Sequence, residues 1–535
     1  MSINEFFASF FNLLREIYLN SKIYDKKISS KENNSLIHKP SLSILSCIIK
    51  YDKKKNKIED FETEKIWDLE KIKEQDFKKL NNFFWLFSID LKSSKNISIS
   101  IIENWIRKNQ KFNKELWDID ILAKRIISWI SNSKLIYDEG NLEYKKKFNR
   151  LIFKQINHLI NEINRSKDYN NKLIGCTAVI LVGLAYDHEN FLNYGLDLLK
   201  KIINLSFDSE YFPKSRSIRQ LAFYIKYFVL IRELIKDSSN VVPEYLDEII
   251  FHLGKGYNFV WGSHKASLLF NGNNESNLEE FDKYLTQQKY SFKNTKIELG
   301  GYGILRNKNF LLAMDIGNNP ENKFIENYQS GPLSFEIIYK DKKIFCNCGY
   351  HQNLNHRLNK ISRSTAAHTT LVLDNTSVTN FKKSIKGSLQ NKTNFRILNK
   401  NVVFEKNYWL IKGSHDGYLR EFGIIHERSL EFYPEKNKLI GKDKLSKKNN
   451  FKSSNFEIRF HLMPNSKVTK TQDNKTVLIE LENSGWKFYT EFGSINVETG
   501  LYFGNKNKFI ENQNVYISGS TENVNHDIKW EISKI

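Results

Sequence analysis

The chain has 535 residues, of which 40% are apolar and 13% aromatic, and its formal net charge is +21. This composition excludes a disordered chain and allows two or three domains with sizeable hydrophobic cores. The excess of Lys and Arg favours polyanionic partners, namely acidic polysaccharide, nucleic acid or an anionic membrane. The lysines are scattered among Asn and Ile, which fits general solvation equally well.

The N-terminal residues 1–20 predict an amphipathic helix. No positively charged segment precedes its apolar stretch and no small-residue cleavage site follows, so we expect no signal peptide. No apolar run approaches the ~18–20 residues of a membrane span, so we expect no transmembrane segment. Residues 21–75 are rich in Lys, Asn and Ser and predict no firm element.

Apolar residues recur at helical spacing from Leu80 onwards, most regularly over residues 144–163. The short loops between helices predict stacked helical hairpins. Further helices are expected at about 172–185, 189–204, 217–236 and 243–253.

Residues 254–296 are richer in Gly, Asn and Ser and predict a linker, and strand patterns separated by turn residues dominate after Lys296. No helix of useful length is expected between the strands, which favours a large antiparallel β-sandwich. The clearest strand patterns lie at residues 369–373, 402–404, 429–432, 457–462, 477–481, 486–491 and 514–518.

The four cysteines form no disulfide framework and no paired zinc-finger spacing. Cys346 and Cys348 are two residues apart on an expected strand, so both point to one face. Two packed thiols are the simpler interpretation of this pair, and a metal pair is the alternative.

Polar residues stand at the ends of successive expected strands in the second half of the chain. They are Arg306, Glu336, Asn347, Arg363 and His368. Together with the residues around them they form a set of motifs: Gly300-Gly-Tyr-Gly, Leu333-Ser-Phe-Glu336, Asn347 before Cys-Gly, Arg363-Ser-Thr-Ala-Ala-His368, His415-Asp-Gly-Tyr418 and Arg459-Phe-His461-Leu-Met-Pro464. This set resembles the C-terminal β-domain of the heparinase II/III family. The resemblance implies a multidomain α + β protein: an N-terminal helix and poorly defined segment at 1–75, an incomplete α/α toroid at 76–285, and a C-terminal antiparallel β-sandwich at 286–535.

The resemblance also implies a carbon–oxygen lyase that cleaves an acidic, uronate-containing polysaccharide, such as a glycosaminoglycan or an alginate-like chain, by β-elimination. In that reaction a donor or cation neutralises the uronate carboxylate while an acid/base group moves the C5 proton. We expect an acidic polysaccharide as partner and no nucleic acid, since no nucleic-acid-binding motif occurs. The resemblance implies a location in the cell envelope or periplasm. Because we expect no signal peptide, the cytoplasm is the alternative location. The oligomeric state is left open.

Three segments carry the site residues that the resemblance implies. Asn171 matches the amide of a family Asn-His pair, with Lys172 in place of the His. Tyr211, in Asp208-Ser-Glu-Tyr211, matches a family Asp-Gly-Gly-(Tyr/His) segment without its glycines, and cations beside it would lower a phenol pKa. Gln329 stands where the family enzymes have a His, and Gln does not titrate.

Asn347 and His368 match positions where metal-binding members have Asp and His, and with Gln329 and Asn347 present we predict neither a metal nor another cofactor. The altered residues leave one alternative open, a relative that binds an anionic glycan without cleaving it. The predicted catalytic residues are Tyr211, His368 and Asn171, and the predicted substrate-binding residues are Lys172, Lys214, Arg216, Gln329, Glu336, Asn347 and Arg363.

Overall fold

The structure is a computed structural model that describes residues 3–29, 35–49, 67, 73–90, 95–262, 264, 266–384, 389–505, 508–524 and 526–535. It forms two compact units. We call the first the helical unit (Met1–Ser206, Phe223–Phe251 and Glu279–Ser291) and the second the β unit (Phe207–Ala222, His252–Leu278 and Phe292–Ile535). Among the described residues, no helix has the length and apolarity needed to cross a membrane.

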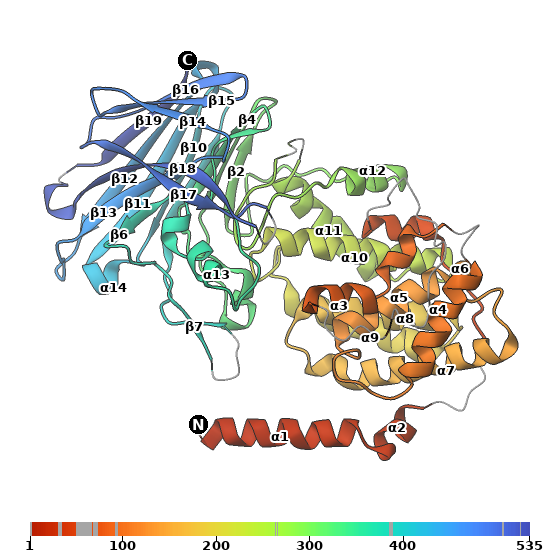
Figure 1. Ribbon diagram of the computed structural model, residues 1–535. Coiled ribbons are helices and arrows are strands. Elements are labelled where there is room, and N and C mark those ends of the chain that lie inside the picture. The colour runs from red at the N-terminus through yellow and green to blue at the C-terminus, as the bar shows by residue number, and fades with distance from the viewer. Residues whose placement is uncertain are drawn as a thin grey trace. The chain divides into compact units, whose positions relative to one another are not determined.

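Helices make up most of the regular structure up to residue 287, coloured red to green in Figure 1. They are α1 Ile3–Leu19, α2 Lys22–Ile28, α3 Glu74–Asn81, α4 Lys95–Lys108, α5 Ile119–Ser131, α6 Ser133–Ile136, α7 Leu142–Glu162, α8 Tyr169–Ala185, α9 Glu189–Ser206, α10 Ile218–Asp237, α11 Glu244–Val260 and α12 Glu279–Gln287.

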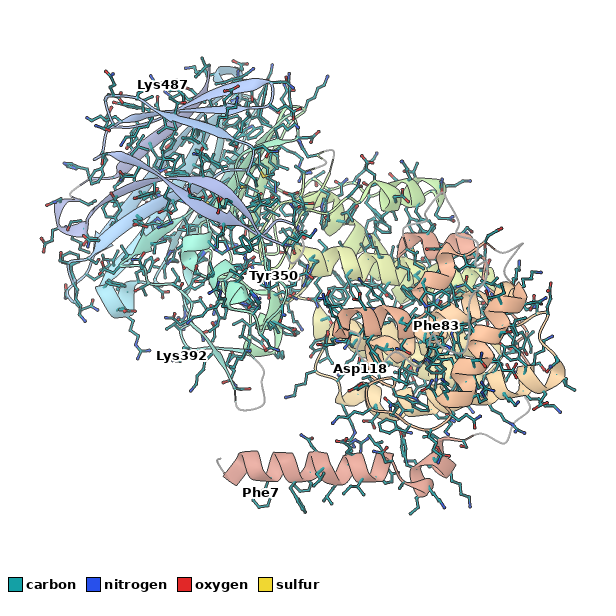
Figure 2. The ribbon with its side chains drawn as sticks, in the orientation of Figure 1. Phe7, Phe83, Asp118, Tyr350, Lys392 and Lys487 are labelled. Carbon is teal, nitrogen blue, oxygen red and sulfur yellow. The ribbon has the colours of Figure 1, made fainter. Side chains whose placement is uncertain are left out.

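Three features of the packing in the helical unit follow from its sequence. Every residue of α8 from Leu173 to Ala185 is buried, as expected for a helix that is apolar on all sides. A side chain at Gly183 would place its Cβ 2.6 Å from the backbone nitrogen of Leu192, so glycine allows α8 and α9 to pack closely. A second buried cluster surrounds Phe83, labelled in Figure 2, whose ring centroid lies 5.2 Å from that of Trp129.

The strands that follow are antiparallel and belong to three larger sheets and one small hairpin sheet. The five-stranded sheet has the order β1 Glu298–Leu299, β2 Tyr302–Arg306, β3 Phe310–Asp315, β4 Phe335–Tyr339 and β5 Lys342–Phe345. The eight-stranded sheet has the order β14 Lys467–Lys470, β15 Thr476–Leu481, β16 Ser484–Thr490, β19 Ile528–Lys534, β12 Lys438–Lys447, β11 Ile424–Tyr433, β10 Trp409–His415 and β9 Ile397–Phe404.

The four-stranded sheet has the order β17 Ile495–Tyr502, β18 Ile510–Ser520, β13 Asn455–His461 and β6 Leu371–Leu373, and the hairpin joins β7 Phe381–Lys383 to β8 Leu389–Asn391. Two short helices, α13 Arg357–Ser362 and α14 Leu419–Phe422, lie between strands. Strand β11 alternates buried and half-buried residues along its whole length, the period-two pattern of a strand with one face in the core.

A buried ion pair lies within the eight-stranded sheet, and its arginine connects that sheet to the segments that precede β4 and β6. Arg428 on β11 holds Asp443 on β12 with two hydrogen bonds of 2.7 and 3.1 Å, and it donates to the carbonyls of Leu333 and Thr369 at 3.1 and 2.8 Å. His426 lies 2.7 Å from the same carboxylate. The segment His426-Glu-Arg428 is therefore part of the buried framework of the β unit.

The predicted fold class, helices followed by antiparallel sheets, is confirmed. The predicted linker at 254–296 is wrong in one respect, because it contains α12, whose buried Phe281, Tyr284 and Leu285 give it one apolar face. Within 21–75, where the sequence predicts no firm element, α2 and a short 3-10 helix at Leu42–Cys47 are present.

Candidate active site

Tyr211 lies on a tight turn of the β unit that Asp208 organises. The Asp208 carboxylate accepts hydrogen bonds from the backbone N–H groups of Glu210 and Phe212 at 2.9 and 2.8 Å. Tyr211 itself adopts a left-handed backbone conformation, with φ of 60°. Such a conformation is costly for a residue with a side chain and persists where the surrounding structure enforces it, often at functional sites.

Arg216 fixes the base of this turn. Its guanidinium donates to the carbonyls of Gly300, Gly301 and Gly317 at 3.2, 2.9 and 3.1 Å, and to Asp315 at 2.5 Å. A Cβ on Gly317 would lie 2.5 Å from the Arg216 Cζ, so glycine is required there. Arg216 is 8% exposed and its donors are engaged within the protein, an arrangement that suits positioning of the Tyr211 turn better than contact with a substrate.

A cavity of about 260 Å³ opens beside Tyr211, and we call it the Tyr211 pocket. The Tyr211 ring stacks on the imidazole of His252, with centroids 4.2 Å apart and planes inclined by 12°. Lys296 pairs with Glu210 at 2.5 Å. The pocket is lined by Ser209, Glu210, Tyr211, His252, Lys255, Lys293, Asn294, Thr295, Lys296 and Leu299, so its positive charges outnumber its single carboxylate.

His252 and the three lysines of this pocket were not among the residues predicted from the sequence. His252 and Lys255 are three residues apart on α11, which places them on one face of the helix. That three-residue spacing in the sequence could have indicated that the two side chains act at one site. Nothing in the sequence, however, connects this helix face to the turn at Tyr211 or to the loop that carries Lys293 and Lys296.

Gln329 is buried and its amide is fully engaged. Its Oε1 accepts from the backbone N–H of Gly272 at 2.9 Å, and its Nε2 donates to the carbonyls of Gly349 and Ser362 at 2.9 and 2.6 Å. An amide presents two donors and an acceptor, which a single imidazole does not reproduce. Gln329 thus fastens three backbone segments together.

Glu336 and Asn347 form a second buried network. One Glu336 oxygen accepts from the backbone N–H groups of Leu269 and Asn347, both at 3.0 Å, and the Asn347 Oδ1 accepts from the Thr369 N–H at 3.0 Å. Burial raises the pKa of Glu336 to about 6, although Lys343 and these N–H donors act in the opposite direction. Both side chains are fully buried.

Arg363 and His368 are also buried. Arg363 donates to Asn359 Oδ1 at 2.8 Å and to the carbonyl of Tyr328 at 2.6 Å. The Nδ1 of His368 lies 2.8 Å from the Ser364 carbonyl, while its buried Nε2 has no hydrogen-bond partner among the residues that the structure describes. Burial lowers the pKa of His368 to about 4, so its imidazole is neutral near pH 7.

Comparison with known proteins shows which family the C-terminal part of the chain resembles. Residues 293–531 match the family model described as Heparinase II/III-like, C-terminal. The C-terminal half of this chain is heparinase II/III-like. The fold of the whole chain matches the crystal structure of heparinase III, with a TM-score of 0.66 and 15% identity over 98% of this chain and 89% of that one.

A mutant of heparan sulfate lyase HepC from Pedobacter heparinus is similar to the same extent, with a TM-score of 0.65 and 14% identity over 91% of this chain and 79% of that one. At these identities the structural likeness establishes the fold. No curated protein is significantly similar to the chain in sequence.

The remaining predicted residues lie in both units. Asn171 and Lys172 occupy the first turn of α8 in the helical unit, after the N-cap Asp168, which accepts from the Asn170 N–H at 2.7 Å. Burial lowers the pKa of Lys172. Lys214 lies in the β unit with Tyr211 and His368. Of the predicted catalytic residues, Asn171 thus lies in the helical unit and Tyr211 and His368 in the β unit, and their catalytic roles stay predictions.

The residues at the family's metal positions do not form a donor set for a metal. The amides of Gln329 and Asn347 are taken up by hydrogen bonds within the protein. Among the described residues, no cluster of three or more His, Cys, Asp or Glu side chains has a geometry that could hold a metal ion.

Proposed function

We propose that this protein cleaves an acidic, uronate-containing polysaccharide by β-elimination in the Tyr211 pocket. The observation that carries the proposal is a tyrosine held at a positive φ, stacked on a histidine and surrounded by lysines. The heparinase II/III-like family model and the heparinase III fold support the same reaction class.

β-Elimination breaks the C4–O4 bond of a uronate and forms a C4=C5 double bond. A base takes the C5 proton, and an acid returns a proton to the departing O4. In the proposal, the phenolate oxygen of Tyr211 takes the C5 proton and the resulting phenol donates it to O4. The one side chain therefore returns to its starting state after each cleavage.

The C5 proton becomes acidic only when the neighbouring carboxylate is neutralised. We assign this role to Lys255 and Lys293, whose ammonium groups line the same pocket as Tyr211. Lys296 also lines it and pairs with Glu210. Lys172, Lys214 and Asn171 remain further candidates for binding the uronate. The ammonium groups of the pocket would also stabilise the phenolate form of Tyr211 by their positive charge.

The alternative function is binding of an anionic glycan without cleavage. Gln329 favours it, since this residue replaces a family histidine and its amide is committed to the backbone of three segments. A lyase that has lost one proton-transferring group keeps a cationic pocket that attracts polyanions.

The experiment is a panel of glycosaminoglycans and alginates incubated with the full chain, with and without a chelator. A lyase creates an unsaturated uronate that absorbs in the ultraviolet, so we expect rising absorbance with at least one substrate and no effect of the chelator. Glycan binding with no absorbance change on any substrate would support the alternative.

Fractionation of the native cells would test the cell envelope or periplasm, which we propose as the location.

A further inference from the structure

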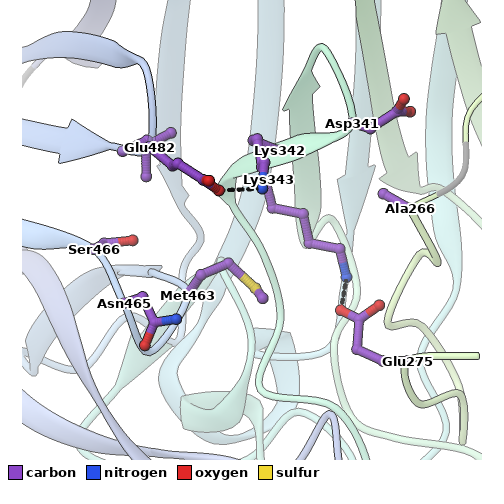
Figure 3. Close-up of a pocket in the computed structure, with 10 residues that line it drawn as sticks. Ala266, Glu275, Asp341, Lys342, Lys343, Met463, Asn465, Ser466 and Glu482 are labelled. Carbon is purple, nitrogen blue, oxygen red and sulfur yellow. Dashed lines mark hydrogen bonds and ion pairs between the residues drawn. The ribbon is translucent and has the colours of Figure 1, made fainter.

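A second cavity of the β unit, of about 360 Å³, lies at the ends of several hairpins. Figure 3 shows its lining, to which the β4–β5 turn, the β13–β14 turn, the β15–β16 turn and the loop around Glu275 contribute. We call it the hairpin pocket. It is lined by Ala266, Glu275, Asp341, Lys342, Lys343, Met463, Asn465, Ser466, Leu481 and Glu482, and it shares no lining residue with the Tyr211 pocket.

Both lysines of the hairpin pocket are neutralised by partners. Lys343, which is 3% exposed, donates to Glu275 at 2.6 Å and lies 3.7 Å from the buried Glu336 carboxylate. Lys342 pairs with Glu482, as the dashed line in Figure 3 shows. Because the lining carries three carboxylates and two ammonium groups, the pocket lacks the excess positive charge that an anionic sugar would need.

The remaining lining groups suit a ligand with hydroxyl groups. Ser466 is buried, and its hydroxyl has no hydrogen-bond partner within the part of the chain that the structure describes. A buried polar group without a partner costs free energy, and rotation of the Ser466 side chain toward the cavity would let a ligand hydroxyl recover it. Asn465 and Asp341 add an amide and a carboxylate on the rim, and the side chains of Met463 and Leu481 supply apolar surface.

We propose that the hairpin pocket binds a neutral sugar unit. Its volume lies within the range of about 300–1,000 Å³ that is usual for ligand sites lined by apolar groups and a few placed polar ones. A sugar ring presents hydroxyls that both donate and accept, matching paired lysines and carboxylates, and C–H faces that match Met463 and Leu481. The site would hold a neutral part of a glycan, or a neutral sugar alone, and needs no lyase activity.

The test is a titration of the full chain with methyl β-D-glucopyranoside as the neutral probe and glucuronic acid as the anionic probe, followed by saturation-transfer NMR and calorimetry. We expect millimolar affinity for the neutral probe. Asn465→Trp, which puts an indole across the rim at an exposed position, should abolish binding, and Ser466→Ala should weaken it about 2–10-fold. Lys467→Ala, an exposed neighbour outside the lining, is the matched control and should change nothing.

Three results would overturn the proposal: no binding of the neutral probe, equal binding by Asn465→Trp with its thermal midpoint unchanged, or tighter binding of glucuronic acid that Asn465→Trp removes. Tyr211→Phe separates the two sites, since it should leave binding of the neutral probe intact. A chain that binds the neutral probe but cleaves no glycan supports this inference and contradicts only the proposed lyase activity.

Discussion

Arg216→Ala should detach the Tyr211 turn from the sheet that supports it. The substitution removes the guanidinium that joins Asp315 to the carbonyls of Gly300, Gly301 and Gly317. The Asp315 carboxylate, 2% exposed, would keep Asn271 as a donor at 3.1 Å but lose its only ion pair among the described residues.

The expected cost follows from burial of the pair. Removing one partner of a buried ion pair typically costs about 3–5 kcal/mol, because the other charge stays buried and uncompensated. A loss of about 3 kcal/mol corresponds to a change of roughly 100-fold in a local opening equilibrium. Arg216→Lys keeps the charge but has fewer donors in a different geometry, so it should fall between Arg216→Ala and the unaltered chain.

Hydrogen exchange followed by mass spectrometry measures this directly. In Arg216→Ala, amides of the segments 207–217 and 300–317 should exchange roughly 100-fold faster, while those of α8 in the helical unit should not change. Arg219→Ala is the matched control, since Arg219 has a side-chain acceptor, Asn327, at 2.9 Å and a half-buried position. A change below about fivefold in Arg216→Ala would refute the role given to this residue.

Three further predictions concern packing, pH and charge. Gly331→Ala would place a Cβ 2.6 Å from the ring of His368, so it should destabilise the protein by about 1–3 kcal/mol, measured by thermal unfolding. Gly485→Ala is the control: its Cβ would have its nearest neighbour at 3.8 Å, and it should cost less than about 1 kcal/mol. Glu336 has a pKa of about 6 in the folded protein against a usual 4.5, so its protonated form should contribute stability below about pH 4.5. About 2 kcal/mol of that stability should be lost as the pH rises through 6. Urea unfolding of Glu336→Gln at a series of pH values should lack this loss, and the same pH dependence in the variant and the unaltered chain would contradict the prediction. Lys172→Ala should weaken binding of an acidic glycan and its dependence on salt, and an unchanged affinity across two ionic strengths would exclude Lys172 from the binding surface.

Periodicity was sufficient to predict helices followed by antiparallel sheets, whereas the α/α toroid was an expectation from the family resemblance. The helical spacing at 144–163 corresponds to α7, Leu142–Glu162, and the pattern at 429–432 marks part of β11, Ile424–Tyr433. Helix α12 was missed because the Gly- and Asn-rich residues around it hide a single short apolar face.

The candidate site was less accessible to sequence reasoning. Tyr211 came from the motif around Asp208, but its stacking partner His252 lies on a helix that no motif connects to that turn. Gln329 and Arg363 stood out as polar residues in a resembling motif, yet their hydrogen bonds show them holding the backbone of the β unit together. A motif shows which residue type occupies a position. It does not distinguish a residue that contacts a substrate from one that supports the fold.

The most direct measurement of the central claim is product formation and glycan binding by Tyr211→Phe beside the unaltered chain. The variant keeps the ring that stacks on His252 and removes only the phenolic oxygen that would carry the C5 proton. The account predicts unchanged glycan affinity and loss of the ultraviolet absorbance that marks the unsaturated product. Full turnover by Tyr211→Phe, on a substrate that the unaltered chain cleaves, would contradict the assignment of the reaction to the Tyr211 pocket.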